Sequence, residues 1–190
     1  MDAIEAIHTR RSVGRVPDAG VAREEIEEIL RAAICAPNHH LTFPWRFVVL
    51  QGSARRALGE VHAAAVMATR PELPAEAFAK EAARLERAPV VIACIARATA
   101  EDEVTRREDR DAVIAAVQNL MLAAHARGLA TMWRTGAMVD APAVREDLAC
   151  GPNDAIVGFV YVGRADGVSR DPTPRPSLDD VTEWRGAERG

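Results

Sequence analysis

The sequence DAVIAAVQNLMLAAHARG occupies residues 111–128 and is the longest nearly apolar segment of the chain. Apolar residues recur in it at the three- and four-residue spacing of one helix face: Val113, Val117, Leu120, Met121 and Ala124. Additional alanines and leucines widen this face, and Gly128 follows where a left-handed residue commonly ends a helix. The segment predicts a helix over residues 111–127 that lies inside the fold or against a second subunit.

Strands and further helices are expected on both sides of this segment. Residues 89–96, PVVIACIA, form a continuous apolar run that is typical of a strand covered on both faces. Other strands are expected at residues 46–50, 129–133 and 156–162, and other helices at residues 2–8, 23–36, 53–69, 75–87 and 140–148, the last capped by Asp140. Residues 97–110 are expected to be a charged connection and residues 164–190 a polar, proline-rich tail.

Length and composition indicate one globular domain spanning residues 1–190. The chain has 48% hydrophobic and 27% charged residues, and its 24 basic and 28 acidic residues give a net charge of −4. This balance favours neither nucleic acid nor a membrane surface as a partner. No signal peptide is readable at the start, and Cys35, Cys94 and Cys150 are widely spaced. We therefore expect reduced thiols in a cytoplasmic protein.

The most basic short stretch is TRRSVGR, residues 9–15. Arginine offers a planar fork of donors that fits phosphate oxygens, and Ser12 and Gly14 add a hydroxyl and a close backbone approach. These residues favour a site for a phosphorylated cofactor. A solvated basic turn is the alternative that the stretch by itself leaves open.

The loop APNHHLTFPW, residues 36–45, separates an expected helix from an expected strand. Asn38 and His39 are candidates for hydrogen bonding to a ligand or stacking on it, although a structural role for the histidine is equally open. His39 and His40 do not predict a metal site, because adjacent residues are expected to point apart and no third ligand has suitable spacing.

The sequence lacks a glycine-rich dinucleotide motif, a Walker loop, an HExxH motif and a nucleophile elbow. Instead, several motifs follow one another in a fixed order: RRS at 10–12, AP at 36–37 with PWRF at 44–47, QNL at 118–120, GL at 128–129, WRTG at 133–136 and VG at 157–158 and 162–163. This order resembles the nitroreductase family of FMN-dependent NAD(P)H oxidoreductases, especially its small members. The resemblance implies an α+β fold with a central, mostly antiparallel sheet flanked by helices, and a homodimer that completes the domain.

The resemblance also implies a flavin site at the subunit interface. Its phosphate end would be held by Arg10, Arg11, Ser12 and, from the tail, Arg175. The flavin ring would lie beside Trp133, Arg134, Thr135 and Gly136, with a backbone N–H near its N5 atom. The partner's flavin would lie along the loop that contains Cys35, Pro37, Asn38 and His39. The nicotinamide nucleotide would lie near the helix end formed by Ala123, Ala124, His125, Ala126, Arg127 and Gly128.

The activity implied by the resemblance is electron transfer from NAD(P)H to a small planar acceptor, such as a nitroaromatic or a quinone, with ping-pong kinetics. No side chain is expected to act as a catalytic acid, base or nucleophile, and no metal is expected. Two alternatives remain open from the sequence. The first is a non-catalytic flavin-binding or storage protein on the same fold. The second is an unrelated small α/β protein that holds another nucleotide at Arg10 and Arg11.

Overall fold

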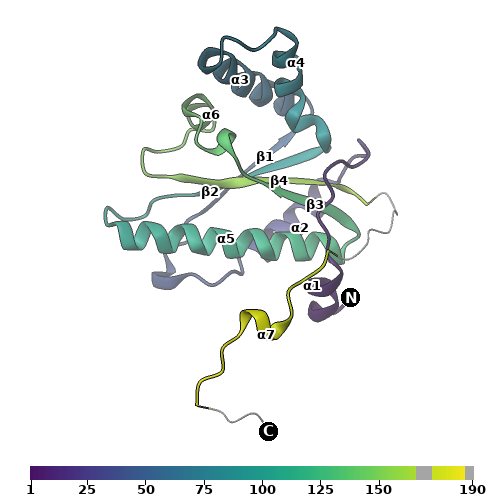
Figure 1. The fold of residues 1–190 in the computed structure, drawn as a ribbon, viewed down its shortest axis with the longest axis vertical. Helices are drawn as coiled ribbons and strands as arrows, with labels where there is room; N and C mark the ends of the chain where they lie inside the picture. Colours follow the sequence, from purple (N-terminus) through teal and green to yellow (C-terminus); the bar gives the residue numbers. More distant parts are fainter. Residues whose placement is uncertain (166–172, 187–190) are drawn as a thin grey trace.

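The fold centres on one four-stranded sheet in the computed structural model, which describes residues 1–165 and 173–186. The strands are β1 (Trp45–Gln51), β2 (Val90–Ala96), β3 (Leu129–Arg134) and β4 (Ala155–Arg164), in the order β1-β2-β4-β3. Every neighbouring pair is antiparallel, which confirms the expected sheet type (Figure 1). Residues 166–172 and 187–190 of the expected tail, including Pro172, lie outside the described residues.

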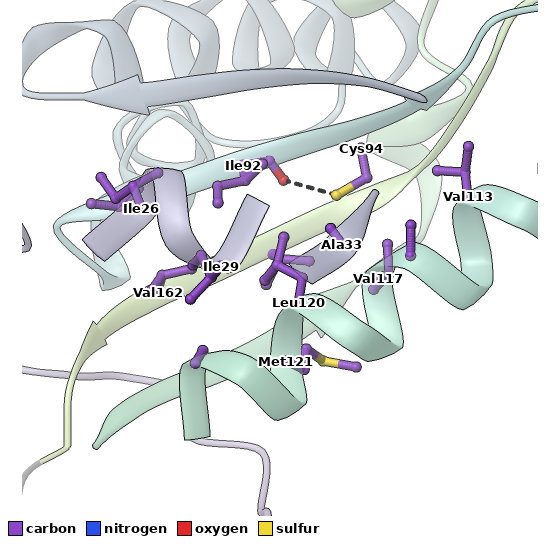
Figure 2. Packing of buried hydrophobic residues seen from close by; sticks show 14 of the residues in the cluster. Ile26, Ile29, Ala33, Ile92, Cys94, Val113, Val117, Leu120, Met121 and Val162 are labelled. Carbon is purple, nitrogen blue, oxygen red and sulfur yellow. Dashed lines mark hydrogen bonds between the residues drawn. The ribbon is translucent and has the colours of Figure 1, made fainter. Parts of the chain in front are cut away.

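Helices α2 (Arg23–Ala33) and α5 (Glu103–Ala126) cover one face of the sheet. Figure 2 shows their apolar side chains meeting those of the strands, with Ile29 and Leu120 among the fully buried residues. Cys94 lies in the same cluster, where burial raises the pKa of its thiol to about 12. The apolar face predicted for the helix at residues 111–127 therefore packs in the core.

Five elements cover the opposite face: α3 (Ser53–Thr69), α4 (Glu76–Ala82), η2 (Ala83–Arg87), η3 (Ala137–Val139) and α6 (Pro142–Asp147). A second apolar cluster lies beneath them and includes Leu58, Leu85, Val144, Phe159 and Tyr161. Two further elements complete the N-terminal half: α1 (Ala3–Thr9), which lies beside the end of α5, and the single turn η1 (His39–Leu41). The sheet is thus covered on both faces, and each face buries its apolar side chains in one of the two clusters.

Several boundaries differ from the sequence prediction; helix α2, for example, ends at Ala33 and not at residue 36. Helix α5 begins at Glu103, eight residues before the predicted start, because the Asp102 side chain accepts a hydrogen bond from Thr105 N and caps it. Most of the expected charged connection is therefore helix. Asp140 does not cap α6, whose N-cap is Ala141, with proline at the first helical position. The end of the helix expected at residues 75–87 is the separate 3₁₀ turn η2.

The tail leaves the body of the domain in Figure 1, and its helix α7 (Leu178–Val181) lies beyond α1 and α5. Leu178, Val181 and Trp184 are 68%, 65% and 66% exposed, which is unusual for three large apolar residues on one short segment.

Among the described helices, none has a stretch that is both long enough and apolar enough to span a bilayer. All three cysteines are within the described residues and none forms a disulfide, as expected.

Candidate functional site

The basic turn is fixed by two neighbouring elements. Helix α1 ends at Thr9, and the following residues run along the outer edge of β3. Ser12 forms a parallel bridge with Thr131, and Val13 N donates to Thr131 O at 3.0 Å. This pairing carries Arg10 and Arg11 to the place where α5 ends and β3 begins.

A hollow of about 370 Å³ opens beside this turn. Its polar lining comes from the turn, the end of α5 and the start of β3: Thr9, Arg10, Arg11, His125 and Thr131. Gly128, which has a φ of 73° and follows α5 as predicted, forms part of the wall. Of the basic stretch at residues 9–15, Thr9, Arg10, Arg11 and Val13 line this hollow, whereas Ser12 does not. That the stretch holds a phosphorylated cofactor stays a prediction.

Positive charge accumulates at this hollow, and its lining, as far as the chain is described, contains no carboxylate. The pKa of Arg10 is lowered first by burial and then by the charges of Arg175 and Arg11. Arg10 Nη1 and Arg11 Nε are buried and have no hydrogen-bond partner among the described residues. Arg11 Nη1 donates to His8 O at 2.7 Å and to Arg10 O at 2.9 Å, so part of its fork holds the turn. An anion in the hollow would satisfy the remaining donors and offset the repulsion among the arginines.

His125 connects the helix end to the same hollow. Its Nε2 lies 2.8 Å from Thr9 Oγ1, and the Thr9 hydroxyl also donates to Glu5 O at 2.7 Å. Burial, followed by the charges of Arg10 and Arg11, lowers the pKa of His125. The imidazole is therefore neutral near pH 7 when no anion is bound, and its titration reports on the charge in the hollow.

Saturating the protein with inorganic phosphate should raise the pKa of His125, because the anion offsets the repulsion from Arg10 and Arg11 and stabilises the protonated ring. The ring-proton shifts of His125 in an NMR pH titration measure this change. An Arg10→Ala variant provides the matched control, since it should raise the same pKa without any anion. An unchanged His125 titration at saturating phosphate would contradict binding at this hollow.

The residues expected near the nicotinamide are not all brought together. His125 and Gly128 line the hollow, but Ala124 is fully buried in the core and Arg127 pairs with Glu28. Ala123 is partly buried, while Ala126 is exposed. The described end of α5 therefore contributes chiefly to the hollow that contains the arginines.

Residues 133–136, which are expected to lie beside the flavin ring, are at the C-terminal end of β3. The Trp133 indole N–H donates to Val157 O at 3.3 Å and lies across β4. A side chain at Gly158 would overlap the indole nitrogen, so only glycine permits this packing. Beyond it, Thr135 is exposed, and Gly136 has a φ of 107°, a conformation that other residues rarely adopt.

The loop before β1 is organised by its own side chains. Asn38 Oδ1 accepts from Phe43 N at 2.8 Å, and Asn38 Nδ2 donates to Thr42 Oγ1 at 3.0 Å. Thr42 Oγ1 in turn donates to Asp109, which is 1% exposed and also accepts from Thr99 N and Thr99 Oγ1 at 3.1 and 2.7 Å. The Asn38 amide thus holds the loop together, while Cys35, Pro37 and His39 are exposed on it.

Replacing Asp109 with alanine should lower the free energy of unfolding by about 2–4 kcal/mol, since three donors lose a buried acceptor. Asp109→Asn retains one acceptor oxygen and should lose less. Urea denaturation measures both variants. Asp111→Ala, an exposed acidic residue on the same helix, is the control and should stay within about 0.5 kcal/mol of the parent protein. An Asp109→Ala variant as stable as this control would show that the network does not stabilise the fold.

The two histidines do not point apart, and the sequence argument on this point is wrong. His40 has a φ of 61°, and the resulting turn brings the His39 and His40 rings to a centroid distance of 3.9 Å. Glu108 Oε2 lies 3.3 Å from His40 Nε2, and the three potential ligand atoms fall within 4.8 Å of one another. The third ligand could not be found from spacing, because Glu108 is distant in sequence and reaches the loop only through the fold.

This loop and the basic hollow lie near opposite ends of α5. His40 contacts the helix at Glu108, whereas Thr9 contacts it at His125. These 17 positions correspond to about 26 Å along the helix axis at about 1.5 Å per residue. Within one chain, the loop expected to lie along the partner's flavin is therefore far from the turn expected to hold the chain's own flavin.

A family model described as "Nitroreductase family" matches residues 7–164. The chain belongs to the nitroreductase family. The matched region contains the basic turn, the loop before β1 and the complete sheet. The family resemblance based on the order of the sequence motifs is thereby confirmed.

Relatives and solved structures that are similar to this chain support its assignment to the nitroreductase family. It is 35% identical over 163 residues to the Escherichia coli K12 protein named "Putative NAD(P)H nitroreductase YdjA", covering 86% of this chain and 88% of that protein. The crystal structure of a nitroreductase-like family protein from Bacillus cereus is similar with a TM-score of 0.86 and 25% identity, covering 98% and 97% of the two chains. A nitroreductase-type structure from Desulfovibrio desulfuricans, solved in complex with FMN, has a TM-score of 0.75 and 25% identity, covering 98% of each chain.

Sequence reasoning missed one polar residue that lines the hollow of this nitroreductase-family protein. Thr131 is predicted only as part of a strand, whereas Thr9 belongs to the basic stretch that favours a site. The Thr131 hydroxyl is buried without a hydrogen-bond partner among the described residues, although it lies in a wall that includes two arginines. The alternation of β3 places Thr131 on the α5 side, but only the tertiary structure shows a hollow there.

Proposed function

We propose that this protein is an FMN-dependent oxidoreductase that passes electrons from NAD(P)H to a small planar acceptor, such as a nitroaromatic or a quinone. One observation carries the proposal: buried arginine donors without partners converge on a hollow beside the edge strand of a nitroreductase-family fold. The FMN complex of the Desulfovibrio desulfuricans relative supports FMN as the anion that these arginines would hold.

The residues at the hollow fit the phosphate end of this cofactor. Arg10 would donate its Nη1, which has no hydrogen-bond partner among the described residues, and Arg175 would add charge; the lowering of the Arg10 pKa by the charge of Arg175 supports this role. Ser12 and the Thr131 hydroxyl would supply neutral donors. His125 and Gly128, first associated with the nicotinamide, fit the phosphate end better because they line the same hollow.

The segment at residues 133–136 would position the ring. Gly158 allows the Trp133 indole to lie across β4, and the positive φ of Gly136 sets the path of the exposed backbone after β3. Bound FMN would supply the redox chemistry of the reaction. The protein's own residues would bind it, orient it and leave one face open to NAD(P)H and the acceptor in turn, which is the arrangement expected for ping-pong kinetics.

A second copy of the chain would complete the site. The loop with Pro37, Asn38 and His39 lies about 26 Å along α5 from the contact between Thr9 and His125, by the helical rise per residue, so it fits a flavin held by a partner better than one held by its own chain. Large apolar side chains are exposed on the same side of the sheet: Met1, Ile4, Ile7, Leu41, Phe43, Val104, Leu178, Val181 and Trp184. The elements that carry most of these residues, α1, α5 and the tail, lie on one side of the sheet in Figure 1. An exposed apolar surface of this kind is typical of an interface.

Sedimentation velocity at micromolar concentration should show a dimer, because burial of this apolar surface favours association. Deleting the residues from Leu178 onward removes three of the exposed apolar side chains and should shift the equilibrium toward the monomer. Cofactor binding should weaken in the same variant. A stable monomer that retains flavin with full occupancy would contradict the shared site.

The activity itself is tested with purified protein. An absorption spectrum with the two flavin bands, and extraction of FMN, would support the cofactor and exclude a site for an unrelated nucleotide. Steady-state oxidation of NADH and of NADPH with a nitroaromatic and a quinone then separates an oxidoreductase from a flavin storage protein. Bound FMN without turnover for any acceptor would favour the storage role.

A further inference from the structure

A second cluster of arginines surrounds a small hollow on the other face of the sheet. Arg84 and Arg87 come from η2, and Arg134 comes from the end of β3. The remaining lining is supplied by Thr135, Met138, Phe159 and Tyr161. Within the described residues this hollow is distinct from the one at Arg10, because β3 directs successive side chains to opposite faces and Arg134 lies with Tyr161, away from α5.

The three guanidinium groups lie near one side chain, that of Tyr161. The Arg134 guanidinium carbon lies 5.7 Å from the centre of the Tyr161 ring, and the Tyr161 hydroxyl donates to Arg84 O at 3.3 Å. Burial raises the pKa of Tyr161, while the nearby charges of Arg134, Arg87 and Arg84 oppose that rise. All three charges are thus close to the same phenol.

Two of these three charges have no ion pair within the described residues. Arg84 pairs with Glu81, with its Nη2 at 3.0 Å from Glu81 Oε1, but no carboxylate among the described residues forms an ion pair with Arg87 or Arg134. Arg134 Nε is buried and also lacks a hydrogen-bond partner there. A set of like charges held around a polar hollow is stabilised when a small anion enters it.

We propose that Arg84, Arg87 and Arg134 bind the carboxylate of an anionic aromatic electron acceptor. The hollow of about 40 Å³ would hold about three waters at the 10–15 Å³ that each requires, which suits a carboxylate and is too small for an aromatic ring. Thr135 belongs both to this hollow and to the segment proposed to face the flavin ring. A carboxylate held here would therefore place its attached ring beside the site of electron transfer. This inference rests on the proposed function and specifies its substrate class.

The experiment uses the FMN-loaded protein with 4-nitrobenzoate and its neutral isostere 4-nitrobenzamide. In an Arg87→Gln variant, kcat/KM for 4-nitrobenzoate should fall roughly 10-fold or more, as expected when one charge-assisted hydrogen bond is lost. The value for 4-nitrobenzamide should stay within about twofold. Arg70→Gln, which removes an exposed arginine from the end of α3, is the matched control and should change neither value.

FMN content and the flavin midpoint potential are measured on the same samples. Equal losses for both acceptors, or a shifted potential, would show that the arginines serve the flavin or the fold and would overturn the proposal. An Arg87→Gln variant with unchanged values for both acceptors would overturn it as well. If the parent protein reduces the benzamide and quinones but the benzoate shows no dependence on Arg87, only this inference fails. If no acceptor supports NAD(P)H oxidation, the proposed function fails with it.

Discussion

Arg10→Ala should weaken FMN binding roughly 10- to 100-fold while leaving riboflavin binding nearly unchanged. The Arg10 guanidinium has a buried donor without a partner and is half-buried beside Arg11 and Arg175, so it is well placed to pair with a phosphate group. Hydrogen bonds to charged groups contribute about 1.5–3 kcal/mol, which corresponds to this loss of affinity. Riboflavin lacks the phosphate group, so its affinity should not depend on the interaction with Arg10.

Fluorescence titration of apoprotein with each flavin gives both affinities. Arg15→Ala is the control, because Arg15 lies in the same basic turn but is exposed and does not line the hollow. This variant should bind FMN within about twofold of the parent protein, since exposed charges are largely screened. Parallel losses of FMN and riboflavin in Arg10→Ala would assign Arg10 to the fold instead of the phosphate.

Gly136→Val should abolish both flavin binding and turnover. Valine is strongly disfavoured at a φ of 107°, so the backbone after β3 would have to take another path. No atom outside the adjacent residues lies within 4 Å of the position of an added Cβ, so the expected effect comes from backbone conformation and not from crowding. Thr135→Ala preserves the backbone and should keep most of the binding and activity.

Thr135→Pro tests the same segment in a different way. Proline removes the backbone N–H that is proposed to meet flavin N5. We expect slow reduction by NAD(P)H in this variant, even where FMN remains bound. Stopped-flow absorbance with reconstituted protein measures the rate. Reduction as fast as in Thr135→Ala would place the N5 contact elsewhere.

Most regular elements could be predicted from local pattern. Strand β2 follows from seven consecutive apolar residues, all of which are buried in the structure. The C-terminal end of α5 follows from Gly128, whose positive φ confirms the expected helix stop. The start of α5 was missed because the charged residues around Asp102 resemble a loop in composition. The capping hydrogen bond to Thr105 N, and not hydrophobicity, decides where the helix begins.

The candidate site was predictable in part. Arg10 and Arg11 could be selected because a cluster of guanidinium groups is suited to phosphate. The second cluster was not visible, since Arg84, Arg87 and Arg134 are separated by up to 50 residues and only Arg134 lies in a recognised motif. Asp109 was likewise assigned to a charged connection, although it is a buried acceptor that fixes the loop before β1.

The sequence by itself determined the elements and the family, because hydrophobic periodicity, helix-ending glycines and the order of short motifs are local properties of the chain. Only the tertiary structure decided which polar groups meet. The left-handed backbone at His40 brings the His39 and His40 rings together, whereas an extended backbone would separate them. The close packing of Trp133 on Gly158 sets the path of residues 133–136. Antiparallel pairing and the length of α5 then placed the basic hollow and the Asn38 loop far apart. Such positions depend on contacts between residues distant in sequence, which no local pattern encodes.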